Sequence, residues 1–323
     1  MKKMFFLLAT VIFFMSCNND EEDISDIDFK QEMRDFVIGI SEYSRSNNPD
    51  FFIIPQNGIE LVTTNGEEDG SLHTGYLSAI DGNGQEDLFY GYDIDDQATP
   101  TDENNYLKTF LDRSKNAGNT ILVTDYCSTP SKMDNSYSQN NASGYVSFAA
   151  TQRELNNIPD YPGPIYGENN GLISSLSEVK NFLYLINSEN YGSKTAFINA
   201  VTSTNYDMLI MDFFFDDTEA FTSDEINQLK NKANGGKRLV ISYMSVGEAE
   251  DYRYYWQSGW YTDKPGWMDA ENPDWEGNYK VKYWEAAWQN IIFGNDSSYM
   301  KKILDADFNG VYLDIIDAYE YYE

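Results

Sequence analysis

The C-terminal part of the chain most constrains its fold, because a strand-like segment there lacks the helix that should follow it. Residues 310–314, Gly-Val-Tyr-Leu-Asp, form an apolar run that ends on an acid, and only nine residues follow Asp314. In a β/α unit the next element is a helix. Helical spacing of apolar residues occurs instead at 29–44, shortly before the strand-like run 51–54. We therefore expect a circularly permuted barrel, in which the N-terminal helix follows the C-terminal strand.

Eight strand-like segments separated by helix-length stretches predict an α/β fold, a (β/α)8 or TIM barrel. The expected strands lie at 51–54, 76–80, 120–125, 182–186, 207–213, 238–243, 279–283 and 310–314. A capped helix is expected to begin near Thr222, with Glu225 completing the capping pattern. Residues 128–170 lack periodicity and are rich in Ser, Asn, Pro and Gly, so a long surface excursion is expected there. Residues 29–323 should form one domain.

The first 16 residues have the pattern of a lipoprotein signal peptide. Two lysines precede an apolar run at 4–15 that is too short for a stable membrane span, and Phe-Met-Ser-Cys ends it like a lipoprotein cleavage site. The alternative is a secreted chain with a chance cysteine. Residues 17–28 resemble the acidic tether of surface lipoproteins in Bacteroidetes. We expect lipid on Cys17 and a place in the outer membrane, exposed at the cell surface or facing the periplasm.

Charge and residue content limit the partners and the chemistry. A formal net charge of −31 argues against nucleic-acid binding, which needs a cationic surface, and favours cationic or neutral partners. With Cys17 lipidated, only Cys127 remains, so no disulfide framework is expected. His73 is the sole histidine, which argues against histidine-containing metal sites and leaves any Ser-His-Asp triad dependent on one residue. We expect no metal, no cofactor and carboxylate chemistry.

Acidic residues gather where the expected strands end, which is where the reactive groups of such barrels lie. The acids are Asp81, Asp125, Asp212, Glu248, Glu250, Asp251, Asp314 and Asp317, and the loop after the first strand carries amides in Gln56-Asn57-Gly58, of which Asn57 is expected in the site. For any single acid, helix capping or loop solvation is an equally good interpretation. Aromatic residues are interleaved with the acids between Tyr243 and Trp284. Rings stack on sugars while carboxylates bind hydroxyl groups and transfer protons, so the set favours a carbohydrate site, with core packing or a loop lid as the alternative for the rings.

Several motifs resemble those of glycoside hydrolase family 114, the endo-α-1,4-polygalactosaminidase-like barrels. In the second half they are SYMSVGEAEDYR at 242–253, ENPDWEGNYKVKYW at 271–284 and FNGVYLDIIDAY at 308–319. Two blocks in the first half resemble the family as well, PDFFIIPQNG at 49–58 and AIDGNGQEDLFY at 79–90. In the family these two blocks follow the LDIIDAY block, whereas here they precede it. This order agrees with a circular permutation.

The resemblance implies hydrolysis of the glycosidic bonds of a polysaccharide or oligosaccharide, with a cationic amino sugar as one option. Together with the signal-peptide pattern, it leads us to expect a surface lipoprotein with this activity. It implies two catalytic carboxyls: Asp314 as nucleophile or charge stabiliser, and Glu86, expected in the loop after strand 76–80, as general acid/base. Carboxyls about 5–5.5 Å apart suit retention of configuration, and about 6.5–9.5 Å suits inversion. The expected substrate-binding residues are Asp81, Asp212, Glu248, Glu250, Tyr243, Asn57, Tyr283, Trp284 and Asp317. Arg253 is expected to form an ion pair within its own acidic loop.

Two other function classes stay open at this point. One is a lipoprotein on the same fold that binds glycans without cleaving them, and the other is a barrel enzyme of different chemistry, such as a carbohydrate esterase or lyase. A carboxyl with a raised pKa that faces a second carboxylate would favour the hydrolase, since binding alone needs only rings and hydrogen bonds.

Overall fold

The computed structural model describes residues 24–216 and 218–323. The expected signal peptide, the lipid site Cys17 and most of the acidic tether lie outside the described residues. In the part that is described, no helix is both long enough and apolar enough to cross a membrane.

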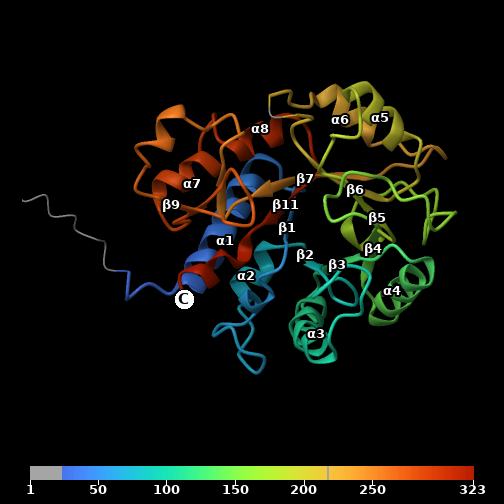
Figure 1. Ribbon diagram of the computed structural model, residues 1–323, viewed down its shortest axis with the longest axis horizontal. Coiled ribbons are helices and arrows are strands. Elements are labelled where there is room, and N and C mark those ends of the chain that lie inside the picture. The colour runs from blue at the N-terminus through green and yellow to red at the C-terminus, as the bar shows by residue number, and fades with distance from the viewer. Residues whose placement is uncertain (1–23, 217) are drawn as a thin grey trace, which may run out of the picture.

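Within these described residues, eight parallel strands carry the fold, and their helices lie around them (Figure 1). The strands are β1 (Phe52–Pro55), β2 (Gly82–Glu86), β3 (Thr120–Tyr126), β4 (Val146–Ala150), β5 (Phe182–Tyr184), β6 (Met208–Asp212), β7 (Leu239–Ser245) and β11 (Gly310–Asp314). One sheet has the order β1-β11-β7-β6-β5 and another the order β2-β3-β4. A parallel bridge between Gln56 and Gly84 joins β1 to β2, and β4 lies against β5. The predicted α/β fold with parallel sheets is confirmed, and this ring order is compatible with a (β/α)8 barrel.

The helices are α1 (Phe29–Asn47), α2 (Thr74–Ala79), α3 (Thr101–Asn116), α4 (Pro130–Ser143), α5 (Lys194–Thr202), α6 (Ser223–Leu229), α7 (Ala286–Ile292) and α8 (Tyr299–Asp305). Helix α1 begins where expected, since the Asp28 side chain accepts the Gln31 N–H at 2.9 Å and caps the first turn. Its apolar stripe, Phe29, Met33, Phe36, Val37 and Ile40, is buried. The capping box of Thr222 and Glu225 at the start of α6 is also confirmed.

The two ends of the described chain lie together. Strand β1 pairs in parallel with β11, with Phe52 opposite Gly310 and Pro55 opposite Leu313, so the predicted adjacency of these strands is confirmed. Helix α1 packs against α8 and against η4 (Ile316–Tyr321), the 3-10 helix that follows β11. Lys30 of α1 forms an ion pair with Glu323, and the C-terminus lies beside the start of α1 in Figure 1. Helix α1 therefore lies against the segment that follows β11.

Strand β2 corrects the prediction of a strand at 76–80. Residues 74–79 form α2, because Tyr76, Leu77 and Ala79 turn one face of a short helix into the core. The strand lies at Gly82–Glu86 instead, and its sequence Gly-Asn-Gly-Gln-Glu contains no large apolar residue. Glycine is required at 84, because a Cβ there would lie 1.9 Å from the Tyr312 hydroxyl. A buried strand without apolar side chains gives no hydrophobic pattern to detect.

Two further expectations about elements were wrong. Residues 128–170 are not one surface excursion, since they contain α4 and β4, a regular helix–strand unit; the irregular part runs from 151 to 181 and contains only η2 (Leu176–Glu178). The segment 279–283 is not a barrel strand. It overlaps β10 (Asn278–Val281), the middle strand of a separate antiparallel sheet with β8 (Glu248–Glu250) and β9 (Met268–Glu271). This small sheet stands after β7 and forms a wall beside the strand ends.

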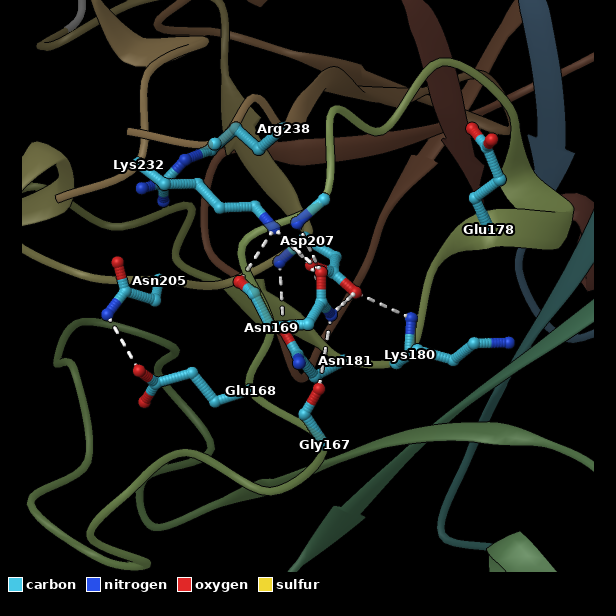
Figure 2. Close-up of polar contacts among 12 residues, drawn as sticks. Gly167, Glu168, Asn169, Glu178, Lys180, Asn181, Asn205, Asp207, Lys232 and Arg238 are labelled. Carbon is cyan, nitrogen blue, oxygen red and sulfur yellow. Dashed lines mark hydrogen bonds and ion pairs between the residues drawn. The ribbon is translucent and has the colours of Figure 1, made fainter. Parts of the chain in front are cut away.

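A buried polar cluster holds the irregular segment against the N-terminal end of β6 (Figure 2). The Asp207 carboxylate, just before β6, accepts hydrogen bonds from Lys232 Nζ at 2.5 Å, from Asn169 Nδ2 at 2.8 Å and from the Lys180 N–H at 2.8 Å. The side chains of Asp207 and Lys232 have no exposed surface. This acid is at the opposite end of the strand from Asp212, so its role is structural.

Candidate active site

The C-terminal ends of the parallel strands surround a cavity of about 660 Å³. Glu86 ends β2, Asp212 ends β6 and Asp314 ends β11, while Gln56 follows β1. In parallel α/β folds this end of the strands is where loops from different units share one mouth. The cavity is lined by Gln56, Asn57, Glu86, Tyr126, Arg153, Glu154, Leu155, Tyr184, Ile186, Asn187, Ser188, Glu189, Asp212, Phe214, Phe215, Asp216, Tyr243, Ser245, Glu248, Glu250, Tyr252, Arg253, Trp275, Asn278, Asp314, Ile315 and Asp317.

Glu86 and Asp314 face each other in this cavity. The side-chain nitrogen of Gln56 donates to Glu86 Oε2 at 3.0 Å and to Asp314 Oδ1 at 2.9 Å. Because both oxygens bond to one nitrogen, they lie within about 6 Å of each other. The two carboxyls predicted from the sequence are therefore brought together, although Glu86 comes from a strand end rather than from a loop.

Each carboxyl of the pair also has its own hydrogen-bond donors. The Tyr126 hydroxyl donates to Glu86 Oε1 at 2.5 Å, and Asn57 Nδ2 donates to Glu86 Oε2 at 3.1 Å. The Tyr243 hydroxyl donates to Asp314 Oδ2 at 2.6 Å, and the Ile315 N–H donates to Asp314 Oδ1 at 2.9 Å. These donors fix the direction in which both carboxyls point.

The backbone after Asp314 is strained. Ile315 has φ 59° and ψ 39°, a left-handed conformation that is rare for a β-branched residue and costs on the order of 1–3 kcal/mol. The neighbouring Gly247 permits this turn, since a Cβ there would lie 2.2 Å from the Ile315 carbonyl oxygen. The turn directs the Ile315 N–H back to the Asp314 carboxylate. Strain of this kind is typical of functional sites that the surrounding structure holds in place.

Burial shifts the acid–base properties of the pair. Burial and the nearby Asp314 carboxylate raise the pKa of Glu86 to about 7, against the opposing effect of the Tyr126 and Asn57 hydrogen bonds. Burial also raises the pKa of Asp314, while bonds from Tyr243, Ile315 and Gln56 favour its charged form. A carboxyl with a raised pKa therefore faces a second carboxylate, the arrangement that distinguishes an acid–base site from a simple binding site.

Arg253 binds two of the predicted site acids. Its guanidinium makes paired bonds to Asp212 at 2.9 and 2.7 Å and to Glu250 at 2.6 and 3.1 Å, in a buried position. The expected ion pair within the acidic loop is confirmed, and Asp212 joins it from β6. Both carboxylates line the cavity but have their charge balanced by the arginine. They form part of its wall.

Two more predicted residues, Glu248 and Asp317, line the cavity without an ion pair to an arginine. Glu248 accepts a hydrogen bond from Asn272 Nδ2 at 2.8 Å, and burial raises its pKa. Asp317 lies in η4, just beyond Asp314, where burial and the Asp314 charge raise its pKa to about 7.

Three predicted substrate-binding residues lie away from the cavity. Asp81 precedes β2 at the opposite end of the strands, where it pairs with Arg45 at 2.8 Å and accepts the Ile53 N–H at 2.8 Å; it was misplaced because the strand expected before it is a helix. The buried Tyr283 donates its hydroxyl to the Phe29 carbonyl at 2.8 Å. Trp284 packs against Phe29 and Tyr322. Tyr283 and Trp284 thus contact the start of α1 and the C-terminal residues, not the cavity.

Other residues named from the sequence have structural places. His73 caps α2 by accepting the Tyr76 N–H at 3.0 Å, and it does not line the cavity. Asp125 is buried, where it accepts the Phe89 N–H at 2.8 Å and the Ser136 hydroxyl at 2.5 Å. Within the described ranges, no group of three or more His, Cys, Asp or Glu side chains is arranged to hold a metal ion.

Several cavity residues were not among the predicted site residues, and four of them contact the carboxyl pair or its hydrogen-bond partners: Gln56, Tyr126, Arg153 and Tyr184. Tyr126 follows the expected strand-end residue Asp125, and Arg153 lies with its guanidinium 3.9 Å from the Tyr126 ring centre while it bonds to Asp87. Tyr184 donates its hydroxyl to Gln56 Oε1 at 3.0 Å. The available signal was position, since Gln56, Tyr126 and Tyr184 all lie at or next to a strand end. Tyr126 and Tyr184 lie outside the aromatic-rich stretch 243–284 on which the prediction rested, and Gln56 was named only as an amide beside Asn57.

The cavity is strongly acidic. Among the described residues that line it, nine are acidic and two are arginines. Arg253 is paired with Asp212 and Glu250, and Arg153 with Asp87 and Asp95. Seven lining acids therefore have no ion pair to either arginine: Glu86, Glu154, Glu189, Asp216, Glu248, Asp314 and Asp317. An acidic, partly enclosed cavity attracts cations and repels anions.

Exposed rings stand at the rim of the cavity. Trp275 lies in the turn between β9 and β10 with 60% of its surface exposed, and Tyr252 is 38% exposed. The turn is tied to the cavity wall by the bond from Asn272 to Glu248. Rings held in this way can stack on a flat apolar surface of a ligand that extends from the cavity.

Comparison with known proteins finds a family match for the C-terminal part of the chain, together with uncharacterized relatives. Residues 187–323 match the model of the glycoside-hydrolase family GH114. An uncharacterized protein of Methanocaldococcus jannaschii is 41% identical over 41% of this chain and 36% of its own length. Uncharacterized proteins of Thermotoga maritima and Deinococcus radiodurans are each 38% identical over 38% of this chain, and over 36% and 37% of their own lengths. The chain thus spans little more than a third of these curated relatives. The family resemblance is confirmed for residues 187–323, which include Asp212, Glu248 and Asp314; Glu86 lies outside the match.

Proposed function

We propose that this chain is a glycoside hydrolase that cleaves a polysaccharide with Glu86 and Asp314, because residues 187–323 match the GH114 family and the cavity combines this pair of carboxyls. The observation that carries the proposal is the shared hydrogen bonding of the two carboxyls to Gln56. The family match supplies the reaction class and includes Asp314, while the geometry selects Glu86 as the partner.

The spacing supports hydrolysis with retention of configuration. Oxygens within about 6 Å of each other suit a retaining pair better than an inverting pair, which needs space for a water molecule. In the first step an Asp314 carboxylate oxygen bonds to the anomeric carbon, the glycosidic C–O bond breaks, and Glu86 gives its proton to the leaving oxygen. In the second step Glu86 takes a proton from water, whose oxygen bonds to the anomeric carbon and releases Asp314.

The roles follow from the environment of each carboxyl. The pKa of Glu86, raised to about 7, leaves it protonated in part of the molecules near neutral pH, as a general acid requires. Asp314 receives hydrogen bonds from Gln56, Tyr243 and the Ile315 N–H, all of which stabilise a carboxylate. An ionised Asp314 is the form that can act as nucleophile.

We propose an amino-sugar polysaccharide as the substrate class. Seven lining acids without a partner arginine favour a sugar that carries ammonium groups, since the attraction between opposite charges is strengthened in a partly buried cavity. The rings of Trp275 and Tyr252 at the rim suit sugar units beyond the cleaved bond.

We also propose that the fold is a closed (β/α)8 barrel in circularly permuted order. The parallel pairing of β1 with β11 and the position of α1 support this, as does a family match that begins at residue 187, just after the irregular segment 151–181. The test is a variant that joins residue 323 to residue 24 through a short linker and opens the chain near residue 165. It should keep the circular dichroism spectrum and activity of the original chain. An unfolded product would contradict the permutation.

Lipid on Cys17 and attachment to the outer membrane remain part of the proposal. The sequence pattern supports them, and metabolic labelling with a fatty acid tests them. Label that persists after Cys17→Ser would exclude this cysteine as the attachment site.

The test of the proposed function is release of reducing ends from a panel of amino-sugar and neutral polysaccharides. Wild-type protein should release them from at least one substrate, and Glu86→Gln and Asp314→Asn should each lower kcat by a factor of about 100 or more. Wild-type protein that binds an oligosaccharide tightly but cleaves none of the panel would favour the non-catalytic binding role instead.

A further inference from the structure

Gln56 is the one side chain in the described part of the chain that bonds to both carboxyls of the proposed pair. It follows β1, is 2% exposed, and its two amide hydrogens point one to Glu86 and one to Asp314. Its oxygen accepts the hydroxyl hydrogen of Tyr184, at the end of β5 on the far side of the cavity floor. The Gln56 amide thus donates one hydrogen bond to each carboxyl and accepts one from Tyr184.

We propose that Gln56 and Tyr184 act together as a positioning pair, which fixes the separation of the two carboxyls and divides the available protons between them. The inference rests on the proposed function only for its effect on turnover. Its effect on how the two carboxyls titrate holds whether or not the protein is an enzyme.

The orientation of the amide follows from the charges around it. Two carboxylate oxygens about 3 Å away can both be satisfied only by the NH2 end, since the amide oxygen carries no hydrogen. The Tyr184 hydroxyl stabilises this orientation by donating to the other end of the amide. Without that hydroxyl the buried Gln56 oxygen would lose its donor, and rotation of the amide would place its oxygen against a carboxylate.

The amide affects the pair in two ways. Each N–H bond favours the charged form of the carboxyl that accepts it, so Gln56 opposes the effect of burial on both groups. It also separates the two oxygens, which would otherwise be able to share a proton directly. Each carboxyl can therefore exchange its own proton, as a mechanism with one acid and one nucleophile requires.

Other charged and titratable groups surround the pair and would be unchanged by substitutions at Gln56 or Tyr184. From β3 and β7 the hydroxyls of Tyr126 and Tyr243 bond to the carboxyls, and four nearby acids act on them through charge: Asp87, Glu248, Glu250 and Asp317. Two arginines lie one step further away, Arg153 against the Tyr126 ring and Arg253 paired with Glu250. A change in the pKa values of Glu86 and Asp314 in these variants can therefore be assigned to the loss of the hydrogen bonds from Gln56.

The chain provides a matched control in Tyr312. Its ring packs edge-on against Tyr184 with centres 5.3 Å apart, and it is fully buried like Tyr184. Its hydroxyl, however, has no hydrogen-bond partner among the described residues. Tyr312→Phe and Tyr184→Phe remove the same atom from neighbouring rings, but only Tyr184→Phe removes a bond to Gln56.

The experiment is a carbon-13 NMR titration of the side-chain carboxyls in the full chain without any ligand, with signals assigned by Glu86→Gln and Asp314→Asn. Gln56→Met, which keeps the length of the side chain, should move the pKa values of both carboxyls upward by about one unit or more, because each carboxyl loses a hydrogen bond that favours its charged form. Tyr184→Phe should shift them in the same direction by less, and Tyr312→Phe should leave them unchanged.

Activity provides a second measurement, on a substrate that the polysaccharide panel shows to be cleaved by wild-type protein. In Gln56→Met both limbs of the pH profile of kcat should move to higher pH, whereas a purely structural effect would lower kcat without moving the limbs. Unchanged carboxyl pKa values in a folded Gln56→Met variant would overturn the proposal. Equal behaviour of Tyr184→Phe and Tyr312→Phe would overturn the part assigned to Tyr184. Neither result would affect the proposed hydrolase function, which is tested by the loss of turnover in Glu86→Gln and Asp314→Asn.

Discussion

At the scale of single residues, the site depends on carboxyls whose surroundings differ although they lie side by side. Glu86, Asp314 and Asp317 all have raised pKa values because they are buried near one another. Only Glu86 and Asp314 bond to Gln56, and Asp317 stands beyond the strained turn at Ile315. Hydrogen bonding, rather than acidity alone, separates the proposed catalytic groups from their neighbours.

Substitution of Asp317 should therefore have a milder effect than substitution of Asp314. We expect Asp317→Asn to lower kcat about tenfold or less, because it removes a neighbouring charge but no group that contacts the reacting bond. Steady-state kinetics of both variants on one substrate provide the comparison. An Asp317→Asn variant as impaired as Asp314→Asn would mean that the catalytic pair has been assigned to the wrong carboxyls.

The raised pKa of Glu86 also predicts how stability changes with pH. The folded state holds the Glu86 proton up to a pH of about 7, whereas the unfolded state releases it near the ordinary value of 4.5, so folding binds a proton between these values. The free energy of unfolding should therefore fall as the pH rises from 5 to 8. Glu86→Gln should remove the part of this loss that Glu86 causes. The variant should be more stable than wild type at pH 8 by about 1–3 kcal/mol, with little difference at pH 4.

Urea unfolding of wild type and Glu86→Gln at several pH values measures this difference. An advantage of the variant that is equal at pH 4 and pH 8 would show that burial does not raise the pKa of Glu86. Such a result would also weaken its role as the general acid.

At the scale of elements, the β9–β10 turn should act on substrate length. Trp275 is exposed at the cavity rim, so Trp275→Ala should raise KM for a polysaccharide about 5- to 20-fold with little change in kcat, which corresponds to about 1–2 kcal/mol of lost stacking. The control is Tyr261→Ala, an exposed ring from the same region that does not line the cavity. A change in kcat alone for Trp275→Ala would contradict a role in binding distant sugar units.

A second element-scale prediction concerns the cluster at the opposite end of β6. Lys232→Met leaves the buried Asp207 carboxylate without its cation and should lower the free energy of unfolding by about 3–5 kcal/mol. Lys230→Met removes an ion pair with the exposed Asp307 side chain and should lower the free energy of unfolding by about 1 kcal/mol or less. Thermal or urea unfolding distinguishes them, and equal effects would contradict the structural importance of the buried pair.

The sequence predicted those elements that have a clear apolar pattern, such as the helical spacing in α1 and the continuous apolar run in β11. It could not predict β2, whose glycines and amides are buried because Tyr312 occupies the space beside Gly84. It also placed Asp81 in the site and Glu86 in a loop. Both errors have the same cause, which is that the strand expected at 76–80 lies at 82–86. Gln56 was named only as an amide of the loop after the first strand, with Asn57 chosen as the site residue, because an amide becomes informative only when its two carboxylate partners, 30 and 258 residues away, are seen beside it.

At the scale of the whole molecule, the negative charge should affect which substrates bind. An oligomer with free amino groups should bind less tightly as salt rises, because screening weakens its attraction to the acidic cavity, and the same oligomer with acetylated amines should be much less sensitive. Titration calorimetry at two ionic strengths measures both. Equal salt dependence of the two oligomers would count against a cationic substrate while leaving the fold and the carboxyl pair unaffected.

The most direct measurement of the central claim is to trap the sugar on the enzyme. A fluorinated amino-sugar glycosyl fluoride that slows the second step should leave one glycosyl group covalently attached, and peptide mass spectrometry should locate it on Asp314. The account predicts this label in wild-type protein and its absence in Asp314→Asn. A label on another carboxylate, such as Glu248, would contradict the assignment of Asp314 as the nucleophile, and efficient turnover of the reagent with no labelled peptide would contradict the covalent mechanism.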